Sequence, residues 1–168
     1  SLNGAPSPEQ IRLPDGFKIE LLYSVPRDDQ GSWVAMCQDD KGRLIVSDQH
    51  GGIYRFPIPK LGEKVDPASI QQITYSVVGA KARRRIIGTD PKPMTPELAK
   101  LPKIGHAQGL CYAFDSLYVV VSSRSSKLGC GVYRLLDTDG DDNFDKLVKL
   151  KYLGDTAGEH GPHAIIPA

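Results

Sequence analysis

Short runs of apolar residues, each bounded by Gly, Ser or Asp, follow one another through the second half of the chain. Residues 108–114, 116–122 and 131–136 are the clearest of these runs, and each is rich in Val, Leu and Tyr. This composition suits strands that lie on a pleated, half-buried surface. The three runs therefore predict an antiparallel meander.

A weaker copy of this meander lies upstream, over residues 33–38, 43–48 and 53–58. Residues 52–56 (GIYRF) align with residues 131–135 (GVYRL). The alternating runs that follow each copy, over 70–78 and 146–153, can supply a fourth strand to each unit. Repeated units of about four strands are typical of propeller blades.

We therefore expect an all-β fold, a partial β-propeller with about two four-stranded blades, the start of a third and an N-terminal closing strand. The expected segments are the closing strand at 13–25, a blade at 33–78, an insertion loop at 79–104, a blade at 105–153 and the start of the next blade at 160–168. A propeller closes with about 4–8 blades. Either the chain is part of a longer protein, or several copies or another subunit complete the ring.

Composition excludes some classes of function. The 21 basic and 20 acidic residues give a net charge of +1, so the chain lacks the basic surface expected of a nucleic-acid-binding protein. The one dense basic run, residues 81–85 (KARRR), is more typical of a solvated loop. No apolar segment approaches the roughly 20 residues of a transmembrane helix.

The chain has three cysteines, Cys37, Cys111 and Cys130, and no two of them form a Cys-x-x-Cys motif. Without a Cys-x-x-Cys-His motif we expect no covalently bound haem in this chain. Cys37 and Cys111 hold equivalent places in the two repeats. That equivalence favours small buried side chains over a disulfide or a metal site.

The histidines are predicted to lie on one rim of the fold. In a blade of antiparallel strands, the entry to the first strand and the turn between the second and third strands lie at the same end. The residues expected at this end are His50, His106, His160 and His163, joined by Gln108 and Arg124. Such side chains can satisfy the backbone groups of loops, or they can serve as acid/base or ligand groups in a cleft.

An acidic loop is expected at the opposite rim. Asp137, Asp139, Asp141 and Asp145 alternate with other residues as in a calcium loop, because a hard cation needs several oxygens gathered by a tight turn. Position six of the loop is not the Gly of an EF-hand, and position twelve is not its bidentate Glu. The alternative is a solvated hairpin turn. Bound calcium would have a structural role there.

Several segments together resemble a known family. They read LPDGFKIELLYSVP at 13–26, VAMCQDDKGRLIVSDQHGGIYR at 34–55, GHAQGLCYAFDSLYVVV at 105–121, GVYRLLDTDGDDNFDK at 131–146 and GEHGPHAI at 158–165. The sequence is similar to the N-terminal propeller of large secreted bacterial proteins, commonly labelled membrane-bound dehydrogenases. These join a glucose/sorbosone-dehydrogenase-like propeller to helical repeats and a C-terminal c-type haem domain.

The resemblance implies an oxidoreductase in the periplasm or outside the cell, which oxidises a sugar or another alcohol and passes electrons to a haem domain. Related sugar dehydrogenases use pyrroloquinoline quinone, and a His in a His-x-Gly-Gly pattern takes the hydroxyl proton. By this likeness His160 would be the base, although Pro162 stands where the first Gly of the pattern would be. His50, His106, Gln108, Arg124 and His163 would line the pocket. In that family the residues that hold the quinone come from later blades.

Two other functions remain open at this point. The propeller could be a non-catalytic module that binds a carbohydrate or a protein partner, with structural histidines at its rim. Alternatively, the clustered histidines could bind zinc, copper or iron.

Overall fold

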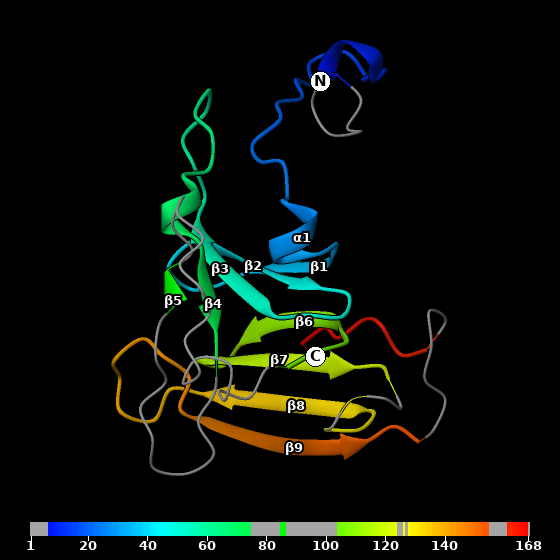
Figure 1. Cartoon of the computed structure of the whole chain (residues 1–168), viewed down its shortest axis with the longest axis vertical. Coiled ribbons are helices and arrows are strands. Elements are labelled where there is room, and N and C mark those ends of the chain that lie inside the picture. Colours follow the sequence, from blue (N-terminus) through cyan, green and yellow to red (C-terminus); the bar gives the residue numbers. More distant parts are fainter. Residues whose placement is uncertain are drawn as a thin grey trace.

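The computed structural model describes residues 7–74, 104–123, 126, 128–154 and 161–167, together with the backbone of residues 85–86. Within these residues the chain forms two antiparallel sheets that lie one against the other (Figure 1). The strands of the first sheet, in spatial order, are β1 (Trp33–Gln38), β2 (Arg43–Asp48), β3 (Ile53–Pro57), β4 (Gln71–Ile73) and β5 (Arg85–Ile86). Those of the second are β6 (Ala107–Ala113), β7 (Ser116–Val121), β8 (Gly131–Leu136) and β9 (Lys146–Tyr152).

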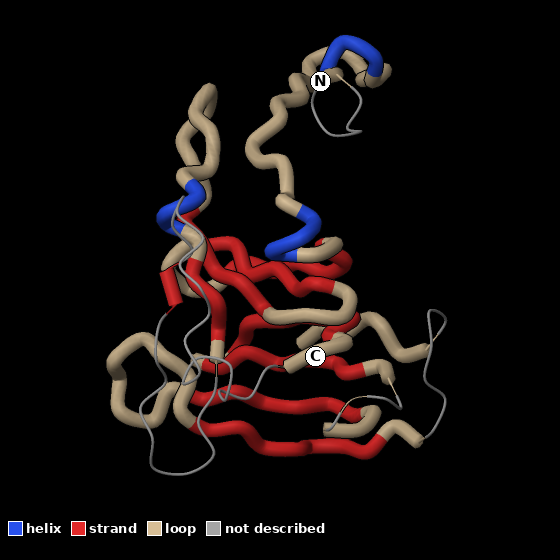
Figure 2. The backbone as a smooth tube through the Cα atoms, viewed as in Figure 1, coloured by secondary structure: helices blue, strands red, loops and turns tan. Residues whose placement is uncertain are grey.

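Helical structure is limited to three short turns among the described residues, namely η1 (Pro8–Gln10), α1 (Arg27–Gln30) and η2 (Pro67–Ser69). Figure 2 shows two of them on the N-terminal segment that leads into the first sheet. None of the helices found in the described ranges has the length and apolar character needed to cross a membrane. The prediction of an all-β fold is therefore confirmed.

Both sheets are simple meanders, because strands that follow one another in the sequence are neighbours in the sheet. Phe114 and Asp115 form the two-residue turn between β6 and β7, with φ angles of 50° and 52°. These angles fit a type I′ turn, whose twist matches that of the flanking strands. In the matching turn of the first sheet, Gly42 has a φ of 74°. The carboxylate of Asp39 closes that turn by accepting the backbone N–H groups of Lys41 and Arg43.

The two sheets are copies of one unit at the level of strand register. The pairing of β1 with β2 shifts between Trp33 and Ala35, and the pairing of β6 with β7 shifts at the equivalent place, between Ala107 and Gly109. Beyond the shift, three residues stand side by side in each sheet. These rows are Cys37, Ile45 and Arg55 in the first sheet, and Cys111, Tyr118 and Arg134 in the second.

Equivalent faces of the two sheets point in the same direction. Ile45 and Ile53 of the first sheet pack into a core shared with Val119 and Tyr133 of the second sheet. The opposite face of the first sheet carries Val46, Tyr54 and Phe56, which pack with Leu22, Tyr23 and Trp33. Val46 and Val119 hold equivalent positions in the two sheets. Val119 faces the first sheet, whereas Val46 faces away from the second sheet. The two sheets therefore stack with equivalent faces pointing the same way.

The predicted closing strand, residues 13–25, stays a prediction, because its partner strands are expected in a blade outside this chain. Residues 17–25 pair with no strand in the described part of the chain. A strand needs a neighbouring strand to which its backbone groups can bond. Here the Leu22 carbonyl accepts a hydrogen bond from the N–H of Val65, at 3.0 Å. The segment instead packs Leu22 and Tyr23 against the first sheet.

One short strand lies within the predicted insertion loop, residues 79–104. We expected no strand between residues 79 and 104, yet β5 lies in this range and pairs with β4 through Gln71 and Gln72. The outer edge of β4 would otherwise present unpaired backbone groups, and the two residues of β5 pair with some of them. Residues 79–84 and 87–103 lie outside the described residues.

Candidate functional site

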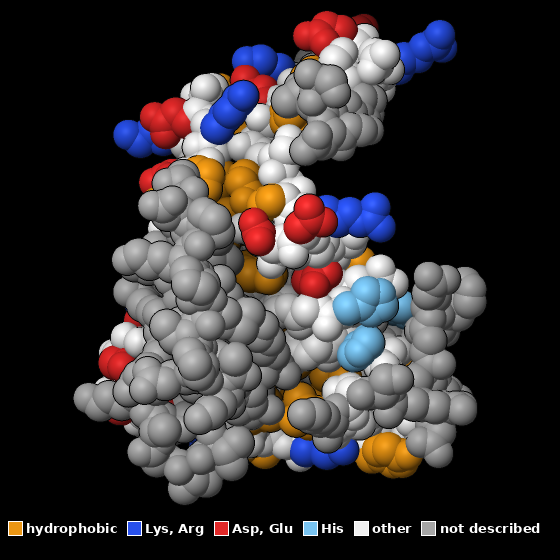
Figure 3. All heavy atoms as spheres, viewed as in Figure 1, with side chains coloured by type: hydrophobic (Ala, Val, Ile, Leu, Met, Phe, Trp, Pro, Cys, Tyr) orange, Lys and Arg blue, Asp and Glu red, His pale blue; other side chains and the backbone are white. Residues whose placement is uncertain are grey.

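Two histidines from successive sheets meet where the sheets join. His50 belongs to the turn between β2 and β3, and His106 immediately precedes β6. Their ring centroids lie 5.3 Å apart, with an angle of 75° between the ring planes. Figure 3 shows the visible histidine side chains gathered in one place on this face. The structure thus brings these two of the predicted site residues together.

The environment of His106 favours a neutral imidazole. Burial lowers the pKa of His106 below 6.5, and the neighbouring His50 lowers it further, while Asp48 acts in the opposite direction. His106 also has a φ of 59°, a left-handed conformation that is uncommon for any residue other than glycine. Residues held in such conformations are found disproportionately at functional sites.

Two more of the predicted rim residues lie near this junction. Gln108 is the half-buried residue at the register irregularity of β6. Irregularities of this kind re-aim side chains and are common beside active sites. The carbonyl oxygen of His163 lies so close to Gly109 that a Cβ there would come within 2.0 Å of it. The buried Nε2 of His163 has no hydrogen-bond partner among the described residues.

Two predicted site residues lie outside the described residues, namely Arg124 and His160. Their places relative to the histidine pair therefore stay predictions. The chemistry that the described residues offer at this rim consists of two adjacent imidazoles, one exposed and one half-buried. A neutral imidazole in a partly desolvated position can accept a proton or bind a cation.

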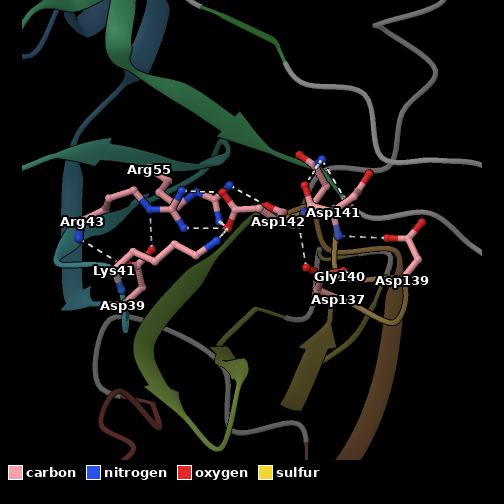
Figure 4. A network of polar contacts seen from close by, with 10 residues as sticks. Asp39, Lys41, Arg43, Arg55, Asp137, Asp139, Gly140, Asp141 and Asp142 are labelled. Carbon is pink, nitrogen blue, oxygen red and sulfur yellow. Dashed lines mark hydrogen bonds and ion pairs between the residues drawn. The ribbon is translucent and has the colours of Figure 1, made fainter.

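A second polar site joins the sheets at the opposite end of the strands, around Asp142 (Figure 4). The Arg43 guanidinium donates to both oxygens of the Asp142 carboxylate, at 2.6 and 2.8 Å. Arg55 donates to the Asp142 backbone carbonyl at 2.8 Å, and the Lys41 ammonium lies 2.8 Å from the carboxylate. On its other side, Arg43 donates through Nε to Asp39 at 2.7 Å. We call these five residues the Asp142 clasp.

The clasp is strongly biased toward its charged state. Hydrogen bonds from Arg43 hold the pKa of Asp142 far below its usual range, although burial opposes this shift. The same bonds raise the pKa of Arg43. The first sheet supplies three cations, and the loop between β8 and β9 supplies the anion, so the clasp fixes how this loop sits on the first sheet.

The remaining aspartates of this loop are arranged differently. Asp137, Asp139 and Asp141 each offer a carboxylate oxygen within 4.8 Å of the others, a spacing that fits a hard cation. Asp145 is not part of this group, because its carboxylate accepts from the backbone N–H and the hydroxyl of Thr138. The carboxylate of Asp137 also accepts from the N–H groups of Gly140 and Asp142. The predicted four-residue set is therefore a three-residue set in the structure.

Sequence reasoning missed the clasp. By its sequence position, Asp142 stands out only because it replaces the Gly at position six of an EF-hand loop. A signal was present, because Arg43 and Arg55 fall on the same face of two paired strands, and one face of a sheet seldom buries two arginines without an acidic partner. The sequence does not say which of the neighbouring aspartates reaches them.

The cysteines are all free thiols, as expected. Burial, reinforced by nearby Cys111, raises the pKa of Cys37 to about 12, so its thiolate is scarce at neutral pH. Cys37 packs against the core between the sheets, which suits a small apolar side chain.

Comparison of the chain with protein-family models, with curated proteins and with solved structures gave no match.

Proposed function

We propose that the two sheets are successive blades of a β-propeller. Three observations support this proposal: the shared strand register, the shared direction of equivalent faces, and the inner strand β6 packed against β1. A fourth is that Met36 is 68% exposed, whereas its equivalent Leu110 is 7% exposed under the first sheet. At Met36 this face is therefore open in the first sheet, although Leu22, Tyr23 and Trp33 pack against the rest of it. A further blade, from the rest of a longer protein or from another subunit, would pack at Met36.

We propose further that these blades belong to a secreted oxidoreductase, in the periplasm or outside the cell, that oxidises a sugar or another alcohol. The observation that carries this proposal is the pair of imidazoles contributed by equivalent rims of successive blades, one of them held neutral. A neutral imidazole can take the hydroxyl proton while the carbinol hydride leaves to a two-electron acceptor. By resemblance this acceptor is pyrroloquinoline quinone, and electrons then pass to a haem domain.

The residues at this rim do not by themselves fit a quinone that carries carboxylates. The charged or titratable neighbours that act on His106 within the described residues are His50 and Asp48, and neither is a permanent cation. Residues elsewhere would have to hold such a group. The role proposed for this chain is therefore to bind and orient the substrate hydroxyl and to accept its proton. His160, by resemblance, and His106, by geometry, are the two candidates for the acceptor.

We also propose calcium as a structural ligand of Asp137, Asp139 and Asp141. The mutual distances of their oxygens support it. The ion would stiffen the loop that carries Asp142, with no part in the reaction.

The test is dye reduction by the assembled propeller, with its remaining blades present and quinone supplied, over a panel of sugars and primary alcohols. His106→Gln and His160→Ala are assayed beside Lys18→Gln, whose side chain pairs with Glu20 at the exposed N-terminal segment. Loss of an acid/base group costs about 10²–10⁴-fold in kcat, so we expect at least one histidine variant to fall by this amount while Lys18→Gln does not.

The same panel separates the alternatives. Sugar binding to the wild type without turnover would identify a binding module. Stoichiometric zinc, copper or iron that is lost in His50→Gln and His106→Gln would identify a metal site instead.

A further inference from the structure

Arg55 and Arg134 occupy the same position in the two sheets. Ile45 stands beside Arg55, and Tyr118 stands beside Arg134 in the equivalent pairing. In the first sheet this arginine is 5% exposed and faces the second sheet. There it donates to the backbone carbonyl of Asp142 and lies over the ring of Phe144, with its Cζ 6.0 Å from the ring centroid.

Arg134 has no such anion. Its Nε donates to the Ser116 hydroxyl at 3.0 Å, and its guanidinium lies over the ring of Tyr118 at 5.8 Å. Neither contact supplies negative charge, and no carboxylate binds Arg134 among the described residues. Arg134 is half-buried on the face that the second sheet turns away from the first. Within the described ranges it therefore lacks the anion that its equivalent, Arg55, has.

One segment of the chain already packs against this face of the second sheet. Gly109 is the register equivalent of Ala35, and the lack of a side chain there lets the His163 carbonyl come up against β6. The segment Gly161–Pro167 therefore contacts β6 through His163, and β6 in turn packs against β1. This is the place of the innermost strand of a following sheet.

We infer that the face of the second sheet that carries Cys111, Tyr118 and Arg134 is the docking surface for a third sheet of the same repeat, entered through Gly161–Pro167. An aspartate in the loop between the third and fourth strands of that sheet binds Arg134, as Asp142 binds Arg55. The inference rests on the proposed blade architecture and adds the chemical rule by which one blade recognises the next.

Charge argues against the simplest alternative, a symmetric dimer through this face. Two copies related by a twofold axis would bring Arg134 toward Arg134 across the interface, since a twofold interface is self-complementary. Like charges brought together in a desolvated interface are unfavourable. An acidic loop carried by a sheet of the same shape supplies both the missing anion and the apolar cover.

The test extends the chain by one copy of its own second repeat. Ile165 aligns with Leu110, so residues 1–165 are followed by a second copy of residues 111–154, which includes a copy of Asp142. Urea unfolding is then measured for this extended chain and for the original one, each with Arg134 and with Arg134→Met. We expect Arg134→Met to lower the urea midpoint of the extended chain about as much as Arg55→Met lowers that of the original chain. In the original chain it should change the midpoint little.

A double-mutant cycle completes the test. Replacing the copied aspartate by Asn should lower the midpoint of the extended chain, and should lower it no further once Arg134→Met is present. An added repeat that folds but shows no such coupling would overturn the Arg134 rule and leave the blade proposal standing. An added repeat that stays unfolded by circular dichroism would overturn the docking surface as well. So would a dimer of the original chain that Arg134→Met dissociates, because that result assigns the face to a second copy. None of these readouts depends on turnover.

Discussion

Arg43 and Asp142 form a two-pronged ion pair across the junction of the sheets, with donor–acceptor distances of 2.6 and 2.8 Å. Arg43 begins the second strand of the first sheet, and Asp142 lies in the last loop of the second sheet. The pair therefore ties together parts of the chain that are far apart in sequence. At the other end of the junction lies the contact between His50 and His106.

We predict that Asp142→Asn destabilises the protein by about 2 kcal/mol. The substitution leaves the partly buried cations of Arg43 and Arg55 without their anion, and breaking a fully buried pair costs about 3–5 kcal/mol. We reduce this value because Asp142 is about a quarter exposed. Asp139→Asn is the matched control in the same loop, and urea unfolding with calcium removed by EDTA should place it within about 0.5 kcal/mol of the wild type. Equal effects of the two substitutions would contradict the clasp.

The pKa of His106 should respond to His50 in a defined way. Burial is the larger cause of the lowered value and His50 is the smaller, so His50→Gln should raise the pKa of His106 only part of the way to 6.5. The measurement is an NMR titration of the imidazole C–H signals. A pKa that does not move, or one that returns fully to 6.5, would show that the two causes are wrongly ranked.

The same shift makes stability depend on pH. Because the folded-state pKa of His106 is depressed, the unfolded chain takes up the proton first. This contribution to stability is present above pH 6.5 and is lost as the pH falls through the folded-state pKa. In His106→Gln the loss of stability between pH 7 and pH 5 should be smaller than in the wild type. Identical pH profiles for the two proteins would count against a buried, neutral His106.

Calcium binding should depend on three aspartates and not on the fourth. If the loop holds calcium, the ion should raise the thermal midpoint of the wild type, and Asp139→Asn should abolish the increase. Asp145→Asn should keep it, because the Asp145 carboxylate is bonded to Thr138. A thermal midpoint that calcium leaves unchanged at millimolar concentration would reject the proposed ion.

Gly109 should be intolerant of any side chain. A Cβ at this position would lie 2.0 Å from the carbonyl oxygen of His163, so Gly109→Ala should push Gly161–Pro167 away from β6. His163→Ala is the control, because it removes the imidazole and keeps the carbonyl. Limited proteolysis should cut the 161–167 segment faster in Gly109→Ala than in His163→Ala. Equal rates would mean that the close backbone contact is not what holds the segment.

Much of the fold could be predicted from local sequence. Alternating apolar positions bounded by turn residues located the strands of both sheets, and the GIYRF and GVYRL segments gave the repeat. The meeting of His50 and His106 followed from the direction of antiparallel strands. These features depend on neighbours in sequence or on simple topology, and for that reason the sequence alone could predict them.

Features that depend on the packing of distant segments could not be predicted in the same way. Residues 17–25 alternate like a strand, but the alternation does not show that Leu22 and Tyr23 pack against the first sheet. Asp142 looks like its neighbours in the acidic run, and only the stacking of the sheets sets it against Arg43. The loss of Asp145 from the predicted cation site has a similar cause, because the fold of the loop brings it to Thr138.

NOE spectroscopy on a methyl-labelled protein can show whether equivalent faces of the two sheets point the same way. We predict NOEs from the Ile45 methyl groups to the second sheet, and from the Val46 methyl groups to Leu22 and Tyr23. The reverse pattern, with Val46 facing the second sheet and Ile45 facing Leu22 and Tyr23, would contradict this arrangement of the sheets.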